Sequence, residues 1–257
     1  MIVFPMAGLS RRFFEKGYTI PKFMLPLWDG TVFDYAVCSF ANSFKSETFL
    51  FIYRETGNVR SFLEARTQAL GISNARYVEL NGPTAGQAET VELGLDSVET
   101  SDSEDLKIFN IDTFRMPWAR TVYPKSETDG FLEVFHGTGD NWSFVRPDPS
   151  NNSLAAETAE KKAISNLCSN GLYGFSSPAL FREALSCERK SPSINELYIA
   201  PLYNHLIHSG YKIGYNLISL DLMNFCGLPS EYEGLTNLPA PFLLSKASDF
   251  IADPIGT

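Results

Sequence analysis

Residues 2–27 read IVFPMAGLSRRFFEKGYTIPKFMLPL, and they combine the features of a phosphate-binding segment. Ile2 to Met6 is an apolar run with the length and composition of a buried strand. Gly8, Leu9 and Ser10 follow as a small-residue turn whose backbone N–H groups can hold phosphate oxygens. Four cations follow this turn: Arg11, Arg12, Lys16 and Lys22. Lys22 comes directly after a proline. The strand, the turn and the cations together predict a site for a polyphosphate.

The composition of the 257 residues is that of an ordinary globular protein, with 44% hydrophobic and 20% charged residues. A net charge of -9 argues against nucleic acid or an anionic membrane as a partner. An acidic protein that binds a nucleoside triphosphate must concentrate cations locally or recruit a divalent metal. The first segment does concentrate them.

The sequence favours a cytoplasmic protein. Its first residues lack the basic region of a signal peptide, and it has no apolar run of about eighteen residues. The four cysteines are scattered without a CxxC pair and are interpreted as reduced thiols: Cys38, Cys168, Cys187 and Cys226. His205 and His208 share a predicted helix face, but we do not expect a histidine metal site.

Strands and helices alternate along the first half of the chain. The pattern predicts strands at residues 2–6, 47–53, 75–80 and 106–111, and helices at residues 31–44, 58–70 and 82–98. This alternation predicts an α/β fold with a Rossmann-like, mainly parallel sheet covered by helices on both faces. Ligands bind such sheets at the carboxyl ends of the strands. Gly8, Asn81 and Asp112 each fall just beyond a predicted strand end, so we expect them to share a site.

The second half is less regular. The predicted strands are residues 130–136, 141–146, 158–167, 171–175 and 212–218, the helices 178–186 and 197–210, and a loop covers 147–153. Neither an internal repeat nor a clear linker is visible, which favours one domain over residues 1–257 with a loosely packed C-terminal tail at 236–257.

A series of motifs, in order along nearly the whole chain, resembles the sugar-1-phosphate nucleotidyltransferases, also called nucleotide-sugar pyrophosphorylases. The motifs are AGLSRRF (7–13), PKFMLPL (21–27), GPTAGQA (82–88), FNIDTF (109–114), AEK (159–161), NGLYGF (170–175), ELYIAPL (196–202) and FCGLP (225–229). The resemblance extends to a branch of this family associated with capsule and surface polysaccharides. It implies a GT-A-like nucleotidyltransferase fold.

The resemblance also implies a reaction. A sugar 1-phosphate attacks the α-phosphorus of a nucleoside triphosphate in line and expels pyrophosphate, with Mg²⁺ as cofactor, which needs positioning and charge neutralisation more than a protein nucleophile. Carried over to this chain, the loop from Ala7 to Arg11 binds the nucleotide. The implied catalytic residues are Arg12, Lys22 and Asp112, with Asp112 also holding Mg²⁺.

Further positions follow from the same resemblance. Asn81 and Gly86 match nucleotide-binding positions near the base, whereas Glu160, Lys161 and Gly171 match sugar-phosphate-binding positions. The nucleotide-binding part then covers about residues 1–125 and the sugar-phosphate-binding part about 126–235. Homo-oligomers are frequent in the family, which makes one an expectation here.

Three departures from the family pattern stand out. Ser10 occupies the position of the second loop glycine, where any need for a positive φ is unfavourable, and Arg11 replaces a small hydroxyl residue. Phe225 occupies the position of an aspartate that supplies the second metal ligand, for which Asp221 or Asn224 are candidates.

Several alternatives stay open from the sequence. Asp112 is also a plausible helix N-cap, and Glu160 with Lys161 a plausible solvated charge pair. A cytidylyltransferase acting on a non-sugar phosphate such as phosphocholine shares the first motifs. The missing late aspartate instead favours a non-catalytic protein that binds nucleotides or sugar phosphates.

Overall fold

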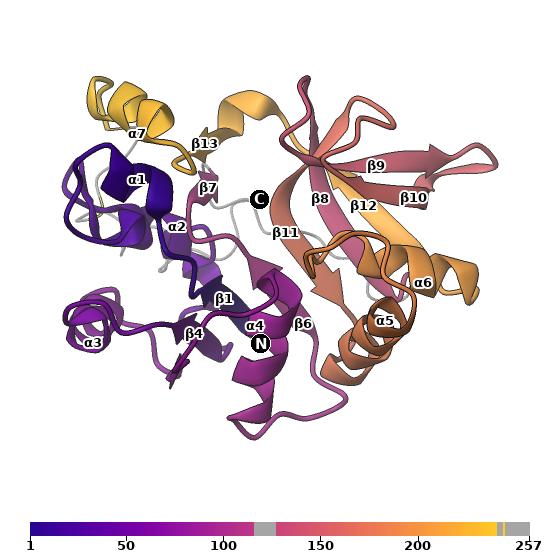
Figure 1. The fold of residues 1–257 in the computed structure, drawn as a ribbon, viewed down its shortest axis with the longest axis horizontal. Helices are drawn as coiled ribbons and strands as arrows, with labels where there is room; N and C mark the ends of the chain where they lie inside the picture. The colour runs from indigo at the N-terminus through magenta and orange to yellow at the C-terminus, as the bar shows by residue number, and fades with distance from the viewer. Residues whose placement is uncertain (116–126, 241–243, 245–257) are drawn as a thin grey trace. The chain divides into compact units, whose positions relative to one another are not determined.

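The computed structural model describes residues 1–115, 127–240 and 244, and these form two compact units (Figure 1). Unit 1 contains Met1–Pro5, Pro83–Phe109 and Val122–Leu220, and unit 2 contains Met6–Gly82, Asn110–Thr121 and Asp221–Thr257. Residues 83–109 of the predicted nucleotide-binding part therefore belong to unit 1. Most of the predicted tail lies outside the described residues.

Unit 1 is built on a mixed sheet. Its described strands are β1 (Ile2–Met6), β6 (Leu106–Phe109), β8 (Gly130–His136), β9 (Ser143–Asp148), β10 (Asn151–Glu160), β11 (Leu167–Phe175) and β12 (Ile213–Leu217). They follow the spatial order β1-β6-β11-β8-β12-β10-β9. The β1–β6 and β8–β12 pairs are parallel, and β6–β11, β11–β8, β12–β10 and β10–β9 are antiparallel.

The prediction of a mainly parallel, Rossmann-like sheet is therefore only partly confirmed. Parallel pairing requires a crossover of a dozen or more residues between consecutive strands. The connection from β9 to β10 is only the turn at residues 149–150, in which Ser150 N and Oγ bond Asp148 Oδ1. Such a short connection allows only an antiparallel pair.

β10 corrects two predictions. The expected loop at 147–153 is instead the end of β9 and the start of β10, and the expected strand at 158–167 ends at Glu160. The first residues of β10 are exposed, so they lack the apolar alternation by which strands are recognised. Lys161 ends the strand with a φ of 53°, in the left-handed region.

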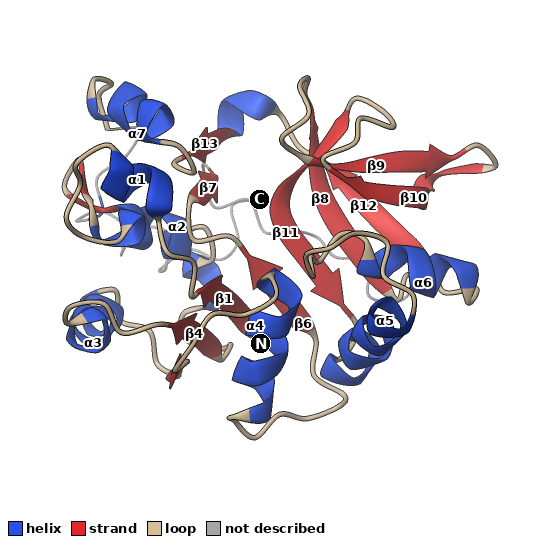
Figure 2. Cartoon of the chain, in the orientation of Figure 1, coloured by secondary structure: helices blue, strands red, loops and turns tan. Residues whose placement is uncertain are grey.

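The helices of unit 1 are α4 (Gln87–Asp96), α5 (Pro178–Lys190) and α6 (Leu202–His208) (Figure 2). Ser177 caps α5, since its Oγ accepts a hydrogen bond from Leu180 N at 3.1 Å. α5 packs on β11, and α6 packs on α5, β10 and β12. The helix predicted at 197–210 is shorter in the structure, because α6 begins only at Leu202. The residues before it are not helical, and the Leu197 backbone forms hydrogen bonds with Ala85 and Ala88 at the start of α4.

Unit 2 contains the parallel pair β4 (Phe49–Tyr53) and β5 (Ala75–Glu79), joined by α3 (Val59–Ala69). Its short helices are α1 (Arg11–Glu15) and α2 (Val32–Cys38). The helix predicted at 31–44 is shorter in the structure, since α2 ends at Cys38, and all its residues are buried. Its N-terminus is a capping box between Thr31 and Asp34, and the buried Asp34 carboxylate pairs with Arg66 at 2.7 Å.

Two further strand pairs in unit 2 were not predicted. They are β2 (Pro26–Leu27) with β3 (Gly30–Thr31), and β7 (Thr113–Arg115) with β13 (Met223–Phe225). α7 (Pro229–Thr236) follows β13. The β7–β13 pair places the FCGLP motif beside Asp112, and Cys226 N donates to Asp112 O at 2.7 Å. Within the described residues, no helix has the length and apolar character needed to cross a membrane.

Candidate active site

The loop after β1 has open space along its backbone. Gly8 and Leu9 are exposed, and a Cβ added to Gly8 would meet no atom within 4 Å. Ser10 has φ 50° and ψ 31°, so the predicted conformational conflict at this position exists. The serine hydroxyl also makes a contact that glycine lacks, because Ser10 Oγ accepts a hydrogen bond from Lys22 N at 3.2 Å. The serine thereby fastens the loop to the Pro21-Lys22 segment.

Lys22 and Asp112 are brought together from distant parts of the sequence. Lys22 Nζ lies 2.5 Å from Asp112 Oδ2, with the two side chains 23% and 20% exposed. Lys22 starts a 3-10 turn (Lys22–Met24), and Asp112 lies in the turn between β6 and β7. Asp112 is therefore half-buried beside a cation and does not cap a helix.

The remaining cations of the loop are accessible. Arg11 and Arg12 open α1, are exposed, and form no ion pair with another described residue. Asn81 is exposed just after β5. Unit 2 thus contains Ala7 to Arg12, Lys22, Asn81 and Asp112.

A second carboxylate near Asp112 was missed by the sequence reasoning. A Cβ added to Gly227 would lie 3.2 Å from Asp112 Oδ2 and 3.5 Å from Glu231 Oε2, so both carboxylates face this glycine. Glu231 Oε2 also accepts from Leu228 N at 2.8 Å, at the start of α7. Burial, followed by the charges of Asp112 and Glu231, raises the pKa of the buried Cys226 thiol. The available signal was a glutamate three residues into a proline-initiated helix, directly after the FCGLP motif.

The residues around Asp112 suit a magnesium ion that takes the rest of its ligands from phosphates. Phe225, at the position of the family's aspartate, pairs with Thr113 in the β13–β7 ladder, and Asp221 is exposed in the turn before β13. Among the described residues, no group of three or more His, Cys, Asp or Glu side chains could hold a metal. Mg²⁺ is usually bound by one or two carboxylates together with substrate phosphates and water. Asp112, with Glu231 near it, fits that pattern.

Gly86, in unit 1, is required by the protein's own backbone. Its φ is 152°, and an added Cβ would lie 2.5 Å from Leu197 O. Leu197 N donates to Ala85 O at 2.9 Å, and Ala88 N donates to Leu197 O at 2.8 Å. Packing alone explains the glycine, and its nucleotide-binding role stays a prediction.

Glu160 and Lys161 lie at the end of β10, also in unit 1. Glu160 accepts a hydrogen bond from Ser143 Oγ, which also lies 3.1 Å from the hydroxyl of Tyr173. Burial raises the pKa of the Glu160 carboxyl, although the Ser143 hydrogen bond and the Lys161 charge act in the opposite direction. Lys161 Nζ bonds the Tyr198 hydroxyl and lies 4.4 Å from the centre of its ring. Glu160 is therefore not a solvated surface carboxylate.

Gly171 lies in an irregular part of β11. Between the pairs Ser169↔Val134 and Tyr173↔Leu132 the register shifts, and Gly171 has a φ of 89°. Asn170 supports the irregularity, since its Nδ2 donates to Glu133 Oε1 at 2.6 Å. The positive φ alone explains why a glycine occupies position 171, independently of any sugar.

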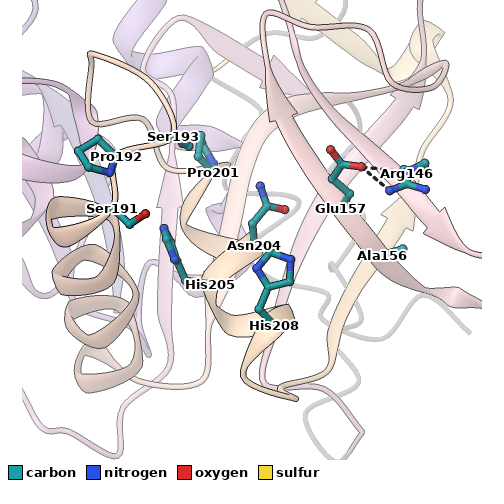
Figure 3. A pocket seen from close by; sticks show the side chains of 10 residues that line it. All are labelled: Arg146, Ala156, Glu157, Ser191, Pro192, Ser193, Pro201, Asn204, His205 and His208. Atoms are coloured by element: carbon teal, nitrogen blue, oxygen red, sulfur yellow. Dashed lines mark hydrogen bonds and ion pairs between the residues drawn. The ribbon is translucent and has the colours of Figure 1, made fainter.

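A separate pocket of about 450 Å³ opens in unit 1 and contains none of the predicted site residues (Figure 3). It is lined by Arg146, Ala156, Glu157, Ser191, Pro192, Ser193, Pro201, Asn204, His205 and His208. On one side of it Arg146 pairs with Glu157 of the neighbouring strand, and His205 Nε2 lies 2.6 Å from Glu188 Oε2. His205 is thus paired with a buried carboxylate.

Comparison with known proteins places this fold. No protein-family profile and no curated sequence matches the chain. A solved nucleoside-diphosphate-sugar pyrophosphorylase from Vibrio cholerae RC9 is 44% identical, covering 93% of this chain and 100% of that one, with a TM-score of 0.88. An inositol-1-phosphate CTP transferase from T. maritima is 16% identical, covering 100% and 97%, with a TM-score of 0.71. A UDP-glucose pyrophosphorylase solved with UDP-glucose is 19% identical, covering 92% and 96%, with a TM-score of 0.72.

The inositol-1-phosphate CTP transferase and the UDP-glucose pyrophosphorylase share the fold with this chain. The Vibrio cholerae protein shows a closer relationship, because its sequence identity is much higher. The relationship to the Vibrio cholerae protein makes the chain an enzyme of the nucleotidyltransferase class. At 44% identity over the full length of the Vibrio cholerae protein, the chain belongs to the nucleoside-diphosphate-sugar pyrophosphorylase family.

Proposed function

We propose that the protein transfers a nucleoside monophosphate from a nucleoside triphosphate to a sugar 1-phosphate, giving a nucleoside-diphosphate sugar and pyrophosphate. The observation that carries the proposal is the Lys22–Asp112 pair at 2.5 Å, which the Ser10–Lys22 hydrogen bond fastens to the open loop that contains Gly8. A cation and a carboxylate held together beside an open loop are suited to a metal-bound polyphosphate. The 44% identity to a nucleoside-diphosphate-sugar pyrophosphorylase supports the same reaction.

The residues of unit 2 have distinct roles in this proposal. The backbone of residues 7–11 binds the triphosphate, Arg11 and Arg12 neutralise its outer phosphates, and Asn81 contacts the base. Asp112, with Glu231 near it, would hold Mg²⁺, which when bound withdraws charge from the phosphate oxygens as a Lewis acid. Lys22 moves its ammonium group from Asp112 to the α-phosphate and the attacking phosphate. An oxygen of the acceptor phosphate forms the new P–O bond as the bond to pyrophosphate breaks, so no side chain acts as nucleophile.

The residues of unit 1 serve the acceptor. Glu160 accepts hydrogen bonds from sugar hydroxyls, Lys161 binds the acceptor phosphate, and Gly171 lets the backbone approach the sugar. A choline phosphate needs an open aromatic face for its quaternary ammonium group. Around Glu160, however, the Tyr198 ring is already covered by Lys161 Nζ at 4.4 Å, and Tyr173 is 5% exposed. The sugar is therefore preferred over the phosphocholine-like acceptor.

The cellular setting extends the proposal. The resemblance of the motifs supports a product used in capsule or surface polysaccharide synthesis. We propose the cytoplasm as the site of the reaction, in keeping with four free cysteines. A homo-oligomer and a single functional domain over residues 1–257 belong to the same proposal.

Pyrophosphate release, measured across a panel of triphosphates and of sugar and polyol phosphates with Mg²⁺, tests this function. Lys22→Ala and Asp112→Ala should each lower the rate about 100-fold or more, because charge neutralisation at the transferred phosphate is lost. Lys45→Ala is the matched control and should stay close to the original rate, since Lys45 is an exposed lysine of unit 2 that bonds the Gly71 carbonyl. Calorimetric binding of Mg·NTP without turnover on any acceptor would instead identify a non-catalytic binding protein.

A further inference from the structure

The segment from Glu196 to Tyr198 touches two groups of predicted site residues in unit 1. On one side, the Leu197 backbone is bonded to Ala85 and Ala88 and packs against Gly86. On the other side, Tyr198 contacts Lys161. Two backbone hydrogen bonds and a close approach that only glycine permits fix the position of this segment. Tyr198 therefore projects from a rigid support.

The Tyr198 hydroxyl is placed between opposite charges. It accepts a hydrogen bond from Lys161 Nζ and donates one to Glu196 Oε2. The same ammonium group lies 4.4 Å from the centre of the ring. Burial and the Glu196 hydrogen bond raise the pKa of Tyr198, so the hydroxyl stays protonated and donates its hydrogen bond to Glu196.

Lys161 has few other restraints on its side chain. Its backbone is fixed, because Lys161 N donates to Trp142 O at 2.9 Å and its φ is 53°. A flexible lysine side chain starting from there could reach the exposed Glu196 carboxylate and pair with it. Such an ion pair would remove the positive charge that an acceptor phosphate needs.

We propose that Tyr198 is a positioning residue that keeps Lys161 apart from Glu196 and directs its ammonium group to the phosphate of the acceptor. The inference rests on the proposed function and adds to it a determinant of acceptor affinity. The phenol is suited to this task because it accepts from the lysine and donates to the carboxylate at once. A phenylalanine would keep the ring and lose both hydrogen bonds.

Steady-state kinetics with separate variation of the two substrates tests the inference. Tyr198→Phe should raise KM for the acceptor phosphate about 10-fold, while kcat and KM for the triphosphate change less than about twofold. Adding Glu196→Gln to Tyr198→Phe should restore most of the acceptor affinity, because the competing charge is gone. Tyr211→Phe is the matched control, since Tyr211 also bonds a glutamate of unit 1, Glu183, without contact to Lys161.

The outcomes separate the inference from the function. If the unmodified protein is active but Tyr198→Phe matches it, or if Glu196→Gln does not restore acceptor affinity, the positioning role is wrong. An equal rise of KM for the acceptor phosphate and for the triphosphate would mean that Tyr198 only supports the fold. Should Tyr198→Phe not fold, Glu196→Gln alone decides: it should lower KM for the acceptor about two- to threefold, and an unchanged or higher KM overturns the inference. Absence of pyrophosphate release from the unmodified protein would instead reject the proposed function.

Discussion

At the scale of single residues, Ser10 shows how one side chain both strains and supports the loop. A left-handed conformation is unfavourable by roughly 1–2 kcal/mol for a residue with a Cβ. The Ser10–Lys22 hydrogen bond offsets this, since such a bond contributes about 1 kcal/mol. The sequence predicted the conflict at Ser10, because a glycine position had become serine, but it held no sign of the bond to Lys22.

Two substitutions at Ser10 separate these effects. Ser10→Ala keeps the strain and loses the bond, whereas Ser10→Gly loses both. We expect the alanine variant to be about 1 kcal/mol less stable than the glycine variant, which should be near the original. Urea unfolding measures both free energies, and equal stabilities would show that Ser10 is not strained.

Gly8 and Gly86 should respond to alanine in opposite ways. Gly8 has open space around it, so Gly8→Ala should change stability by less than about 0.5 kcal/mol and weaken triphosphate binding several-fold. In Gly86→Ala the new methyl group would lie 2.5 Å from Leu197 O, so stability should fall by about 2 kcal/mol or more. Thermal unfolding and nucleotide calorimetry check the pair. Loss of stability at Gly8 would contradict the open loop.

Ser143 should set the pH range of acceptor binding. Glu160 must be ionised to accept sugar hydroxyls, and its pKa is raised by burial and lowered by the Ser143 hydrogen bond. Ser143→Ala removes the lowering contribution, so the fall of kcat/KM for the acceptor on acidification should begin at a higher pH. Ser165→Ala removes a hydroxyl that donates to the Val145 carbonyl and accepts from Leu167 N, and it should leave the profile unchanged. A profile that stays in place in both variants would show that Glu160 does not bind the acceptor.

At the scale of elements, predictability followed the length and apolarity of each segment. The strands at 2–6, 49–53 and 130–136 are buried apolar runs and were found close to their predicted bounds. β7 and β13 have three residues each, which is too short for any periodicity, and they pair across a long stretch of sequence. That pairing brings Glu231 to Asp112, so the missed strand and the missed carboxylate have one cause.

Glu231 offers a test of the element that carries it. Glu231→Gln keeps an oxygen to accept from Leu228 N but removes the charge near Asp112. We expect the affinity for Mn²⁺, measured by electron paramagnetic resonance with a bound triphosphate, to fall several-fold. Glu233→Gln, on the same helix and bonded to Tyr18, is the control and should bind Mn²⁺ normally. Equal affinities in both variants would remove Glu231 from the metal's surroundings.

At the scale of the whole molecule, the two units are built from interleaved segments of the chain. Unit 1 takes its first strand from the start of the sequence and the remainder from residues after 82, and unit 2 resumes at Asn110 and again at Asp221. Single-sequence reasoning divides a chain at linkers, and interleaved units have none to detect. The motifs around Lys22 and Asp112 can nevertheless be recognised in the sequence, because each is a local run of residues.

This interleaving has a consequence for synthesis on the ribosome. β1 is made first, but its parallel partner is β6, with Ile2 opposite Lys107 and Val3 opposite Ile108. Until about a hundred further residues have been translated, the edge of β1 that pairs with β6 stays open. A nascent chain with an uncovered hydrophobic strand is prone to aggregation and is a natural client for chaperones. Co-expressed chaperones or a lower growth temperature should therefore raise the yield of folded enzyme.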